Sequence, residues 1–195
     1  MIDPLGAGAP VAASPFSGLC DFAIDELDKA RADIVCIGDP RVTLEFAIDG
    51  IHMVEGAREV DELIAAIAAA TPKGTVTLYC IAPSDAWEGA HQLIRESFIR
   101  TKRSKDGRSR DNKRLSDVLY VGTSRKMATR TKEHLGFCSR STFGLKLSEW
   151  YPAAGLPLRL TCSVFLPGTS GTVVAALEDA LWERLKPMFG RKGAR

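Results

Sequence analysis

Three short segments with the apolar pattern of β-strands lie far apart in the 195-residue chain, and this spacing most limits what the chain can fold into. Residues 158–166 alternate apolar and polar side chains between two prolines, as a half-buried strand does, whereas residues 75–81 and 118–121 are shorter apolar runs. A chain of this length fits one ordinary domain with an appendage, so the sequence predicts a small sheet whose strands are separated by helices. The predicted helices in this part cover residues 85–98, 125–135, 142–150 and 171–185.

The first part of the chain differs in character from the rest. Residues 1–17 are rich in Gly, Ala, Pro and Ser and contain little to bury, so we expect them to be disordered. Residues 18–73 predict an acidic αβ extension, in which Asp49-Gly50 is the two-residue turn of a hairpin between residues 42–48 and 51–54. Its other predicted elements are helices at residues 17–32 and 60–70 and a strand at residues 34–37.

Charge is unevenly distributed along the chain. Residues 1–90 hold 15 acidic and 5 basic residues, residues 91–146 hold 15 basic and 5 acidic residues, and the remainder holds 6 basic and 4 acidic residues. A basic middle next to an acidic front indicates a surface that meets a polyanion, nucleic acid first, although the same charges also suit a solvated face.

The sequence also indicates a compartment. No stretch has the roughly 18 uninterrupted apolar residues of a membrane span, and the first residues lack the basic and apolar regions of a signal peptide. We therefore expect a cytoplasmic protein with no membrane partner. The five cysteines include no CxxC pair, which argues against a zinc site or a disulfide framework and favours buried free thiols.

The last predicted helix carries a carboxylate that needs a partner. Glu178 shares the apolar stripe formed by Val174, Leu181 and Leu185. Because a buried unpaired charge is costly, Glu178 is either in a salt bridge with a neighbouring arginine or a ligand of a hard metal ion.

The helix at residues 125–135 carries cations at a regular spacing. Lys126, Arg130 and His134 follow at intervals of four residues and would form one cationic face. Such a face suits a phosphate, to which arginine offers two parallel donors, or is simply exposed to solvent.

The residues around these two helices resemble the signature of the GIY-YIG nuclease superfamily, over about residues 75–191. Tyr120-Val121-Gly122, followed by Arg130 and His134, is similar to the second half of that signature, and Leu78-Tyr79-Cys80-Ile81 is similar to the first half. The closing pattern of the family corresponds to Leu177-Glu178, Leu181, Lys186-Pro187 and Phe189.

The sequence departs from the family pattern at a few positions. Thr77-Leu78 stands where the family has glycine and isoleucine, Val121 replaces an isoleucine, and Gly190 replaces the asparagine that often closes the pattern. Tyr79 and Tyr120 lie 41 positions apart, whereas the family usually joins these strands by a short turn. The difference identifies an insertion at about residues 84–116.

The resemblance implies an α+β fold in which a small three-stranded antiparallel sheet is flanked by helices. The three strands would be the segments at residues 75–81, 118–121 and 158–166. The nuclease domain would cover residues 74–195, and its site would lie on the sheet face that carries both tyrosines.

The same resemblance implies roles for five side chains. Glu178 would hold a Mg²⁺ or Mn²⁺ ion, and Arg130 would neutralise the scissile phosphate. Tyr79 would act as general base or would position the attacking water. Tyr120 would supply a second hydroxyl, and His134 would assist Tyr79, because a tyrosine with an unperturbed pKa of about 10 is a poor base.

The basic insertion is the expected contact with DNA. Residues 100–114 form the densest basic run of the chain, which is typical of a mobile loop that binds nucleic acid or of a solvated linker. The candidate nucleic-acid-binding residues are Lys102, Arg103, Lys105, Arg108 and Arg110 in the insertion and Lys126 on the next helix.

The resemblance therefore implies a metal-dependent endonuclease acting on DNA, and the lack of a large additional domain favours a stand-alone restriction-like or defence enzyme over a repair subunit. One alternative is a catalytically silent nucleic-acid-binding module on the same fold, against which the joint presence of Tyr79, Tyr120, Arg130 and Glu178 argues. Another is that the acidic front is a protein-interaction or DNA-mimicking element that restrains the basic part. A homodimer also remains open.

Overall fold

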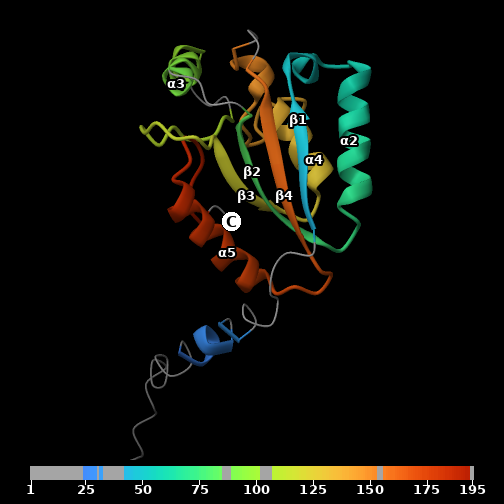
Figure 1. Cartoon of the computed structure of the whole chain (residues 1–195), viewed down its shortest axis with the longest axis vertical. Helices are drawn as coiled ribbons and strands as arrows, with labels where there is room; N and C mark the ends of the chain where they lie inside the picture. The colour runs from blue at the N-terminus through green and yellow to red at the C-terminus, as the bar shows by residue number, and fades with distance from the viewer. Residues whose placement is uncertain are drawn as a thin grey trace, which may run out of the picture.

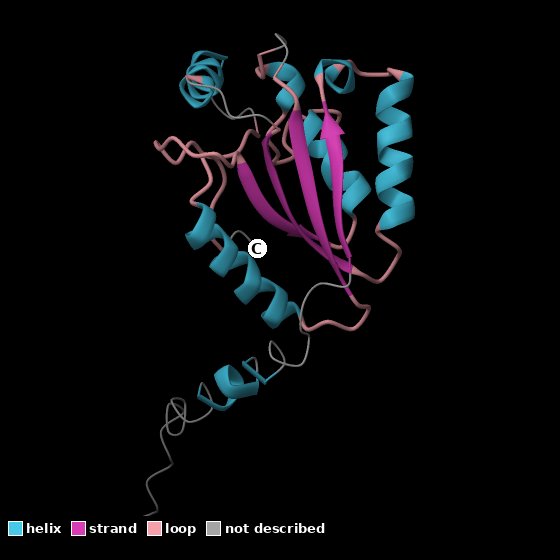
Figure 2. Ribbon diagram, in the orientation of Figure 1, coloured by secondary structure: helices cyan, strands magenta, loops and turns pink. Residues whose placement is uncertain are grey.

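A computed structural model describes residues 24–29, 31–32, 42–84, 89–101, 107–152 and 156–193. These residues form an α+β fold around a four-stranded antiparallel sheet with the strand order β1-β4-β2-β3 (Figure 1, Figure 2). The strands are β1 (Val42–Ile48), β2 (Val76–Pro83), β3 (Tyr120–Ser124) and β4 (Leu158–Phe165). Helices among the described residues include α2 (Arg58–Ala70), α3 (Ala90–Thr101), α4 (Met127–Leu135) and α5 (Gly171–Leu185), with short 3-10 helices η1 (Gly50–Met53) and η2 (Leu147–Glu149).

The sheet has four strands, so the prediction of three was wrong. The additional strand, β1, comes from the acidic front of the chain and pairs with β4 along its whole length, from Val42 opposite Val164 to Ile48 opposite Leu158. Ile48 is buried in the main core, which fixes the register of this edge strand. The sheet therefore draws on residues from both sides of the predicted boundary near residue 74.

The predicted hairpin turn at Asp49-Gly50 was also wrong. Asp49 is the N-cap of η1: its carboxylate accepts a hydrogen bond from the backbone N–H of Ile51, and its own N–H donates to Nδ1 of His52. Aspartate followed by glycine favours a hairpin turn, but aspartate is also one of the best helix caps. The pair therefore begins a helical turn that leads into α2.

Four of the predicted helices are confirmed by α2, α3, α4 and α5, whereas the helix predicted at residues 142–150 is reduced to η2. The reason is a competing backbone pairing. The N–H of Gly144 donates to the carbonyl of Gly107, and the carbonyl of Gly144 accepts from the N–H of Ser109. This segment therefore pairs with the basic insertion instead of forming a helix.

Much of the predicted N-terminal structure lies outside the described residues. Residues 24–29 and 31–32 are helical, as the helix predicted at residues 17–32 requires. The segment at residues 1–17 and the strand at residues 34–37 lie outside the described part. None of the described helices is both long enough and apolar enough to cross a membrane.

The two faces of the sheet pack against different helices (Figure 1). One face belongs to the main core, which contains Tyr79 and Tyr120 together with buried residues of α2 and α4. The other face packs Leu78, Val121 and Phe165 against α5. β3 is an edge strand. Its successive residues therefore contribute side chains to both faces at the rim of the sheet.

Candidate active site

Two tyrosines from neighbouring strands lie side by side on the α4 face of the sheet. In the β2–β3 register Tyr79 is opposite Gly122, and Tyr120 is opposite Ile81, so both side chains point to the same face. Their rings are 6.1 Å apart and nearly parallel, with an interplanar angle of 20°. A Cβ atom on Gly122 would lie 2.8 Å from the Tyr79 hydroxyl and 2.8 Å from Cε1 of Tyr120. The glycine of the Tyr-x-Gly motif is therefore required by the close approach of both rings.

Arg130 joins the two tyrosine hydroxyls through one guanidinium group. Its Nε donates to Tyr79 Oη at 3.1 Å, and its Nη2 donates to Tyr120 Oη at 3.0 Å. Its Nη1 donates to the Glu133 carboxylate and to the Phe143 carbonyl, both at 2.6 Å. Burial by itself lowers the pKa of Arg130, but the nearby oxygens of Tyr79, Tyr120 and Glu133 raise it, and the net shift is upward. The guanidinium is therefore a permanent cation held in a fixed orientation.

His134 fixes Tyr79 from the next turn of α4. Its Nε2 lies 2.8 Å from Tyr79 Oη, and its Nδ1 accepts a hydrogen bond from the backbone N–H of Leu145 at 3.1 Å. Burial lowers the pKa of His134 well below its usual value, and Arg130 lowers it further, so the ring is neutral. A backbone N–H can only donate, so Nδ1 carries the lone pair, and this hydrogen-bond network assigns the proton to Nε2.

The oxygen of Tyr79 consequently accepts from two donors, His134 Nε2–H and Arg130 Nε–H. Its own proton is left for a third partner. Burial raises the pKa of Tyr79 well above 10, and the neighbouring Tyr120 raises it further, while Arg130 lowers it. Tyr79 is therefore a neutral phenol at rest, which favours the role of positioning water over that of an ionised base.

Glu178 approaches β3 from the opposite side of the sheet. Its side chain is 8% exposed, and its Oε2 accepts a hydrogen bond from Thr123 Oγ1 at 2.7 Å. Thr123 follows Gly122 in the strand and so points to the α5 face, away from the two tyrosines. The charge of Glu178 nevertheless contributes to the raised pKa of Tyr79, so the two groups share one electrostatic environment across the edge strand.

An open cavity of about 360 Å³ lies next to Glu178. Thr123, Ser124 and Arg125 line it with the carboxylate, together with small and apolar residues of β2 and α5. The oxygens of Glu178 and Thr123 suit a hard cation that retains most of its waters. The described residues contain no group of three or more His, Cys, Asp and Glu side chains that would hold a metal without such waters.

The predicted cationic face of α4 does not form. Arg130 turns toward the tyrosines, and His134 is 1% exposed and neutral, whereas Lys126 is exposed at the N-cap of the helix. The spacing of four residues places these side chains on one side of the helix but does not reveal that most of this side is buried against β2 and β3.

The described part of the basic insertion is held in place by backbone pairing. Arg108 and Asp111 form isolated bridges with Gly144 and Phe189. Arg108 is 5% exposed; its guanidinium lies 5.2 Å from the centre of the Phe98 ring and donates to Thr101 Oγ1 at 2.9 Å. The expectation of a mobile loop is therefore wrong for this part, and Arg108 faces the core. Arg110 is exposed, while Lys102, Arg103 and Lys105 lie outside the described residues.

Sequence reasoning missed three groups that position the predicted site residues. Thr123 donates to Glu178, Glu133 accepts from Arg130, and the N–H of Leu145 sets the tautomer of His134. Glu133 was accessible to sequence reasoning, because residues three apart on a helix are neighbours. The contact from Leu145 depends on a loop path that carries no sequence signal.

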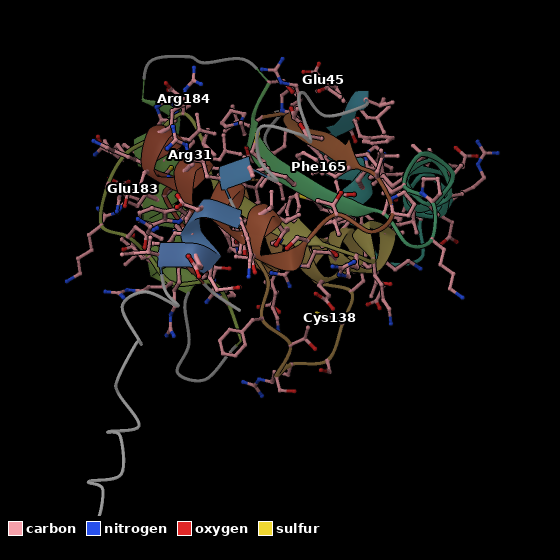
Figure 3. All side chains as sticks on the ribbon, turned by 90° about the horizontal axis from the view of Figure 1, so that it is seen from below. Arg31, Glu45, Cys138, Phe165, Glu183 and Arg184 are labelled. Carbon is pink, nitrogen blue, oxygen red and sulfur yellow. The ribbon has the colours of Figure 1, made fainter. Side chains whose placement is uncertain are left out.

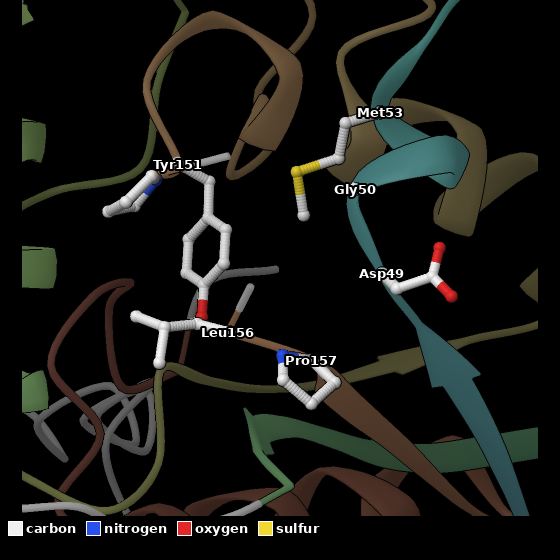
Figure 4. A pocket seen from close by; sticks show the side chains of 7 residues that line it. Asp49, Gly50, Met53, Tyr151, Leu156 and Pro157 are labelled. Atoms are coloured by element: carbon white, nitrogen blue, oxygen red, sulfur yellow. The ribbon is translucent and has the colours of Figure 1, made fainter. Parts of the chain in front are cut away.

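A smaller cavity of about 150 Å³ lies at the far end of the sheet, between η1 and the segment that leads into β4 (Figure 4). The hydroxyl of Tyr151 is buried there and has no hydrogen-bond partner within the described residues. Asp49 is the one ionisable side chain besides this phenol among the described lining residues. The cluster around Arg130 therefore remains the stronger candidate site.

No family model, no curated protein and no solved structure matches this chain, so the site is defined here by its own geometry and chemistry.

Proposed function

We propose that this protein is a metal-dependent endonuclease that hydrolyses DNA phosphodiester bonds, of a restriction-like or defence type. The observation that carries the proposal is the single guanidinium of Arg130 hydrogen-bonded to the hydroxyls of both Tyr79 and Tyr120. The resemblance to GIY-YIG nucleases singles out these residues from segments that are far apart in the chain, and the fold brings them together. Glu178 lies across the same edge strand.

The residues of the α4 face have the groups that phosphodiester hydrolysis needs. Charge develops on the phosphoryl oxygens as water adds to phosphorus and the bond to the leaving oxygen breaks, and a fixed cation such as Arg130 stabilises that charge. The phenol proton of Tyr79 is left for a third partner and would orient the attacking water. Tyr120 would hold the other side of the guanidinium in place.

Glu178, with the hydroxyl of Thr123, would hold Mg²⁺ or Mn²⁺ in the adjoining cavity. A divalent cation there would act as a Lewis acid on a phosphoryl oxygen and lower the pKa of a bound water. Glu178 lies on the other side of the edge strand β3 from Arg130.

Nicking of supercoiled plasmid in Mg²⁺, in Mn²⁺ and in EDTA tests the proposal. The wild-type protein is expected to nick the plasmid with either metal and to be inactive in EDTA. Glu178→Gln should lose about 10²-fold or more in rate. The matched control is Glu45→Gln, because Glu45 is exposed on β1 and lines neither this cavity nor the smaller one next to η1 (Figure 3). Wild-type protein that leaves the plasmid intact with both metals, or that nicks it in EDTA, would contradict the proposal.

A second candidate function is a catalytically silent module that binds nucleic acid. The observation in its favour is that Tyr79 is 1% exposed and that Arg130 already donates to four protein acceptors. Under this alternative, the wild-type protein would bind duplex DNA in a gel-shift experiment but would not nick it with either metal.

A further inference from the structure

A third cavity, of about 480 Å³, lies between residues 110–114, the C-terminal half of α5 and residues 190–192. We call it the basic cavity, because most of its charged side chains are cations. These cations are Arg110, Lys113, Arg114, Arg191 and Lys192. The indole of Trp182 lines the same cavity, and the Arg114 guanidinium lies 4.8 Å from the centre of its ring.

The backbone around the basic cavity is fixed by hydrogen bonds between its two segments. The N–H of Gly190 donates to the carbonyl of Arg110 at 2.9 Å. Asn112 donates through its N–H to the Met188 carbonyl at 2.9 Å and through its side chain to the Pro187 carbonyl at 3.0 Å. The cations therefore project from a rigid frame, so less conformational entropy is lost when they bind a ligand than on a flexible loop.

Lys113 has an unusual backbone conformation that the frame supports. Its φ is +55°, in the left-handed region that non-glycine residues rarely occupy. The Asp111 carboxylate accepts from its N–H at 2.8 Å and is itself paired with Arg95 at 3.1 Å. Non-glycine residues in this conformation cluster at binding sites, because surrounding contacts must hold them there.

The charges of the basic cavity are not balanced within the protein. Asp111 is the one acidic residue among its lining residues, and Arg95 already pairs with it. Lys192 pairs with Glu183 at 2.6 Å. Within the described part of the chain, the other four cations of the cavity make no ion pair with a carboxylate. Four like charges around one concave surface repel one another unless an anion binds between them.

The basic cavity lies beside both parts of the candidate active site. A Cβ atom on Gly190 would lie 3.0 Å from Cε2 of Tyr120, so this wall of the cavity packs against the tyrosine ring. On α5, Trp182 follows Glu178 by four residues, about one helical turn or about 6 Å along the axis. An extended polyanion bound in the cavity would therefore continue toward both Tyr120 and Glu178.

We propose that the basic cavity binds the sugar-phosphate backbone of DNA next to the bond that is cleaved. This inference rests on the proposed nuclease function, because that function supplies DNA as the polyanion. Arginines present two donors to a phosphate, and four cations without acidic partners match consecutive phosphates of one strand. Residues 110–114 and 190–192 therefore anchor the strand, while Arg130 and Glu178 act at its cleaved bond.

The test measures the affinity of the full-length protein for a fixed DNA duplex by fluorescence anisotropy, in EDTA, over a series of salt concentrations. The cavity variant carries Arg110→Ser, Lys113→Ser and Arg191→Ser. A control variant removes the same amount of charge elsewhere, with Arg58→Ser, Lys73→Ser and Arg159→Ser, all exposed positions outside the cavity. Thermal unfolding of each variant shows whether it is folded. If the triple cavity variant is not folded, the single variant Arg191→Ser replaces it in the affinity measurements.

Each phosphate contact contributes about 0.9 to the log–log slope of affinity against salt. The slope of the cavity variant should therefore be lower than that of the wild type by about 2.7, or by about 0.9 for Arg191→Ser alone, while the control keeps the wild-type slope. Equal slopes for the cavity variant and the control overturn the inference. Competition with polyglutamate of equal charge is a second test. If polyglutamate displaces DNA from the wild type as readily as competing DNA does, the inference is overturned, because the ligand of the cavity would then be an acidic protein surface.

The outcomes separate this inference from the proposed activity. If the wild type nicks plasmid but the slopes are equal, the nuclease proposal stands and the basic cavity is not the anchor. If the slopes differ as expected but no plasmid is nicked, the cavity binds DNA and the proposed hydrolysis is wrong. A wild-type protein that does not bind DNA at any salt concentration overturns both.

Discussion

Both faces of the sheet place polar groups near β3, but they organise these groups differently. On the α4 face, Tyr79, Arg130 and His134 are joined by hydrogen bonds in a buried cluster. On the α5 face, Glu178 is held by Thr123 next to an open cavity. One face is therefore closed and preorganised, and the other is accessible to a cation and its waters.

This difference suggests a division of tasks around the edge strand. A closed cluster fixes the orientation of a cation and a phenol without reorganisation during the reaction, which is where protein electrostatics contribute most. An open cavity beside a carboxylate has room for a hydrated metal ion. Changes on the α4 face should therefore affect turnover and folding together, and changes on the α5 face should affect turnover through metal binding.

The largest effect is expected at Arg130. Arg130→Ala should lower plasmid nicking by about 10²-fold or more, because it removes the cation that stabilises developing charge. Arg130→Lys should be nearly as damaging, because an ammonium group cannot bridge both tyrosine hydroxyls as the planar guanidinium does. Initial nicking rates at saturating Mg²⁺ measure both variants. A lysine variant with most of the wild-type rate would reduce Arg130 to a general positive charge.

A smaller effect is expected at Gly122, which lies beneath both tyrosine rings. Gly122→Ala places a methyl group 2.8 Å from the Tyr79 hydroxyl, so the free energy of unfolding should fall by about 1–3 kcal/mol and nicking should slow. Gly171→Ala is the matched control, because a Cβ atom there meets nothing within 4 Å. Urea unfolding of both variants measures the difference. Equal stability would show that the tyrosine cluster is loosely packed.

The sequence alone was sufficient to select Arg130 and His134 by helical periodicity, whereas Tyr79 and Tyr120 were selected by the resemblance to the GIY-YIG signature. Two strands in register place residues on a common face, and a helix places positions four apart on one side. The bounds of α5 were predicted for the same reason: its apolar stripe is regular from residue 174 to residue 185.

The remaining features depend on tertiary packing, which a local pattern does not encode. A run of basic residues predicts an exposed loop, yet Arg108 is buried because its guanidinium stacks on Phe98. Asp49-Gly50 fits both a hairpin turn and a helix cap. The pairing of β1 with β4 joins residues more than one hundred positions apart, and no short motif marks it.

A more modest effect, confined to the α5 face, is expected at Thr123. Thr123→Val removes the hydroxyl that donates to Glu178 and should raise the Mg²⁺ concentration for half-maximal nicking by about 10-fold, as loss of a group that orients a metal ligand typically does. Thr43→Val, at an exposed position of β1, should leave it unchanged. A Mg²⁺ titration of the nicking rate measures both. A loss of activity that no Mg²⁺ concentration restores would contradict a role in metal binding.

The smallest effect is a pH dependence of stability that arises from His134. Burial, together with Arg130, lowers the pKa of this histidine well below its usual 6.5, so below that pH the unfolded chain binds a proton that the folded protein does not. The free energy of unfolding should then decrease as pH falls below about 6.5, by at most about 1.4 kcal/mol per pH unit from this group. His134→Gln should remove this contribution, whereas His91→Gln on α3 should retain it. Urea unfolding at intervals between pH 7.5 and pH 5 gives the slope for each protein. Because the glutamine variant also leaves the Leu145 N–H without its acceptor, its stability will be lower at every pH, and the slope is the quantity that tests the assignment. If the slope is unchanged in His134→Gln, the imidazole of the wild-type protein is protonated in the folded state. The tautomer assigned to His134, which leaves the Tyr79 proton for a third partner, would then be wrong.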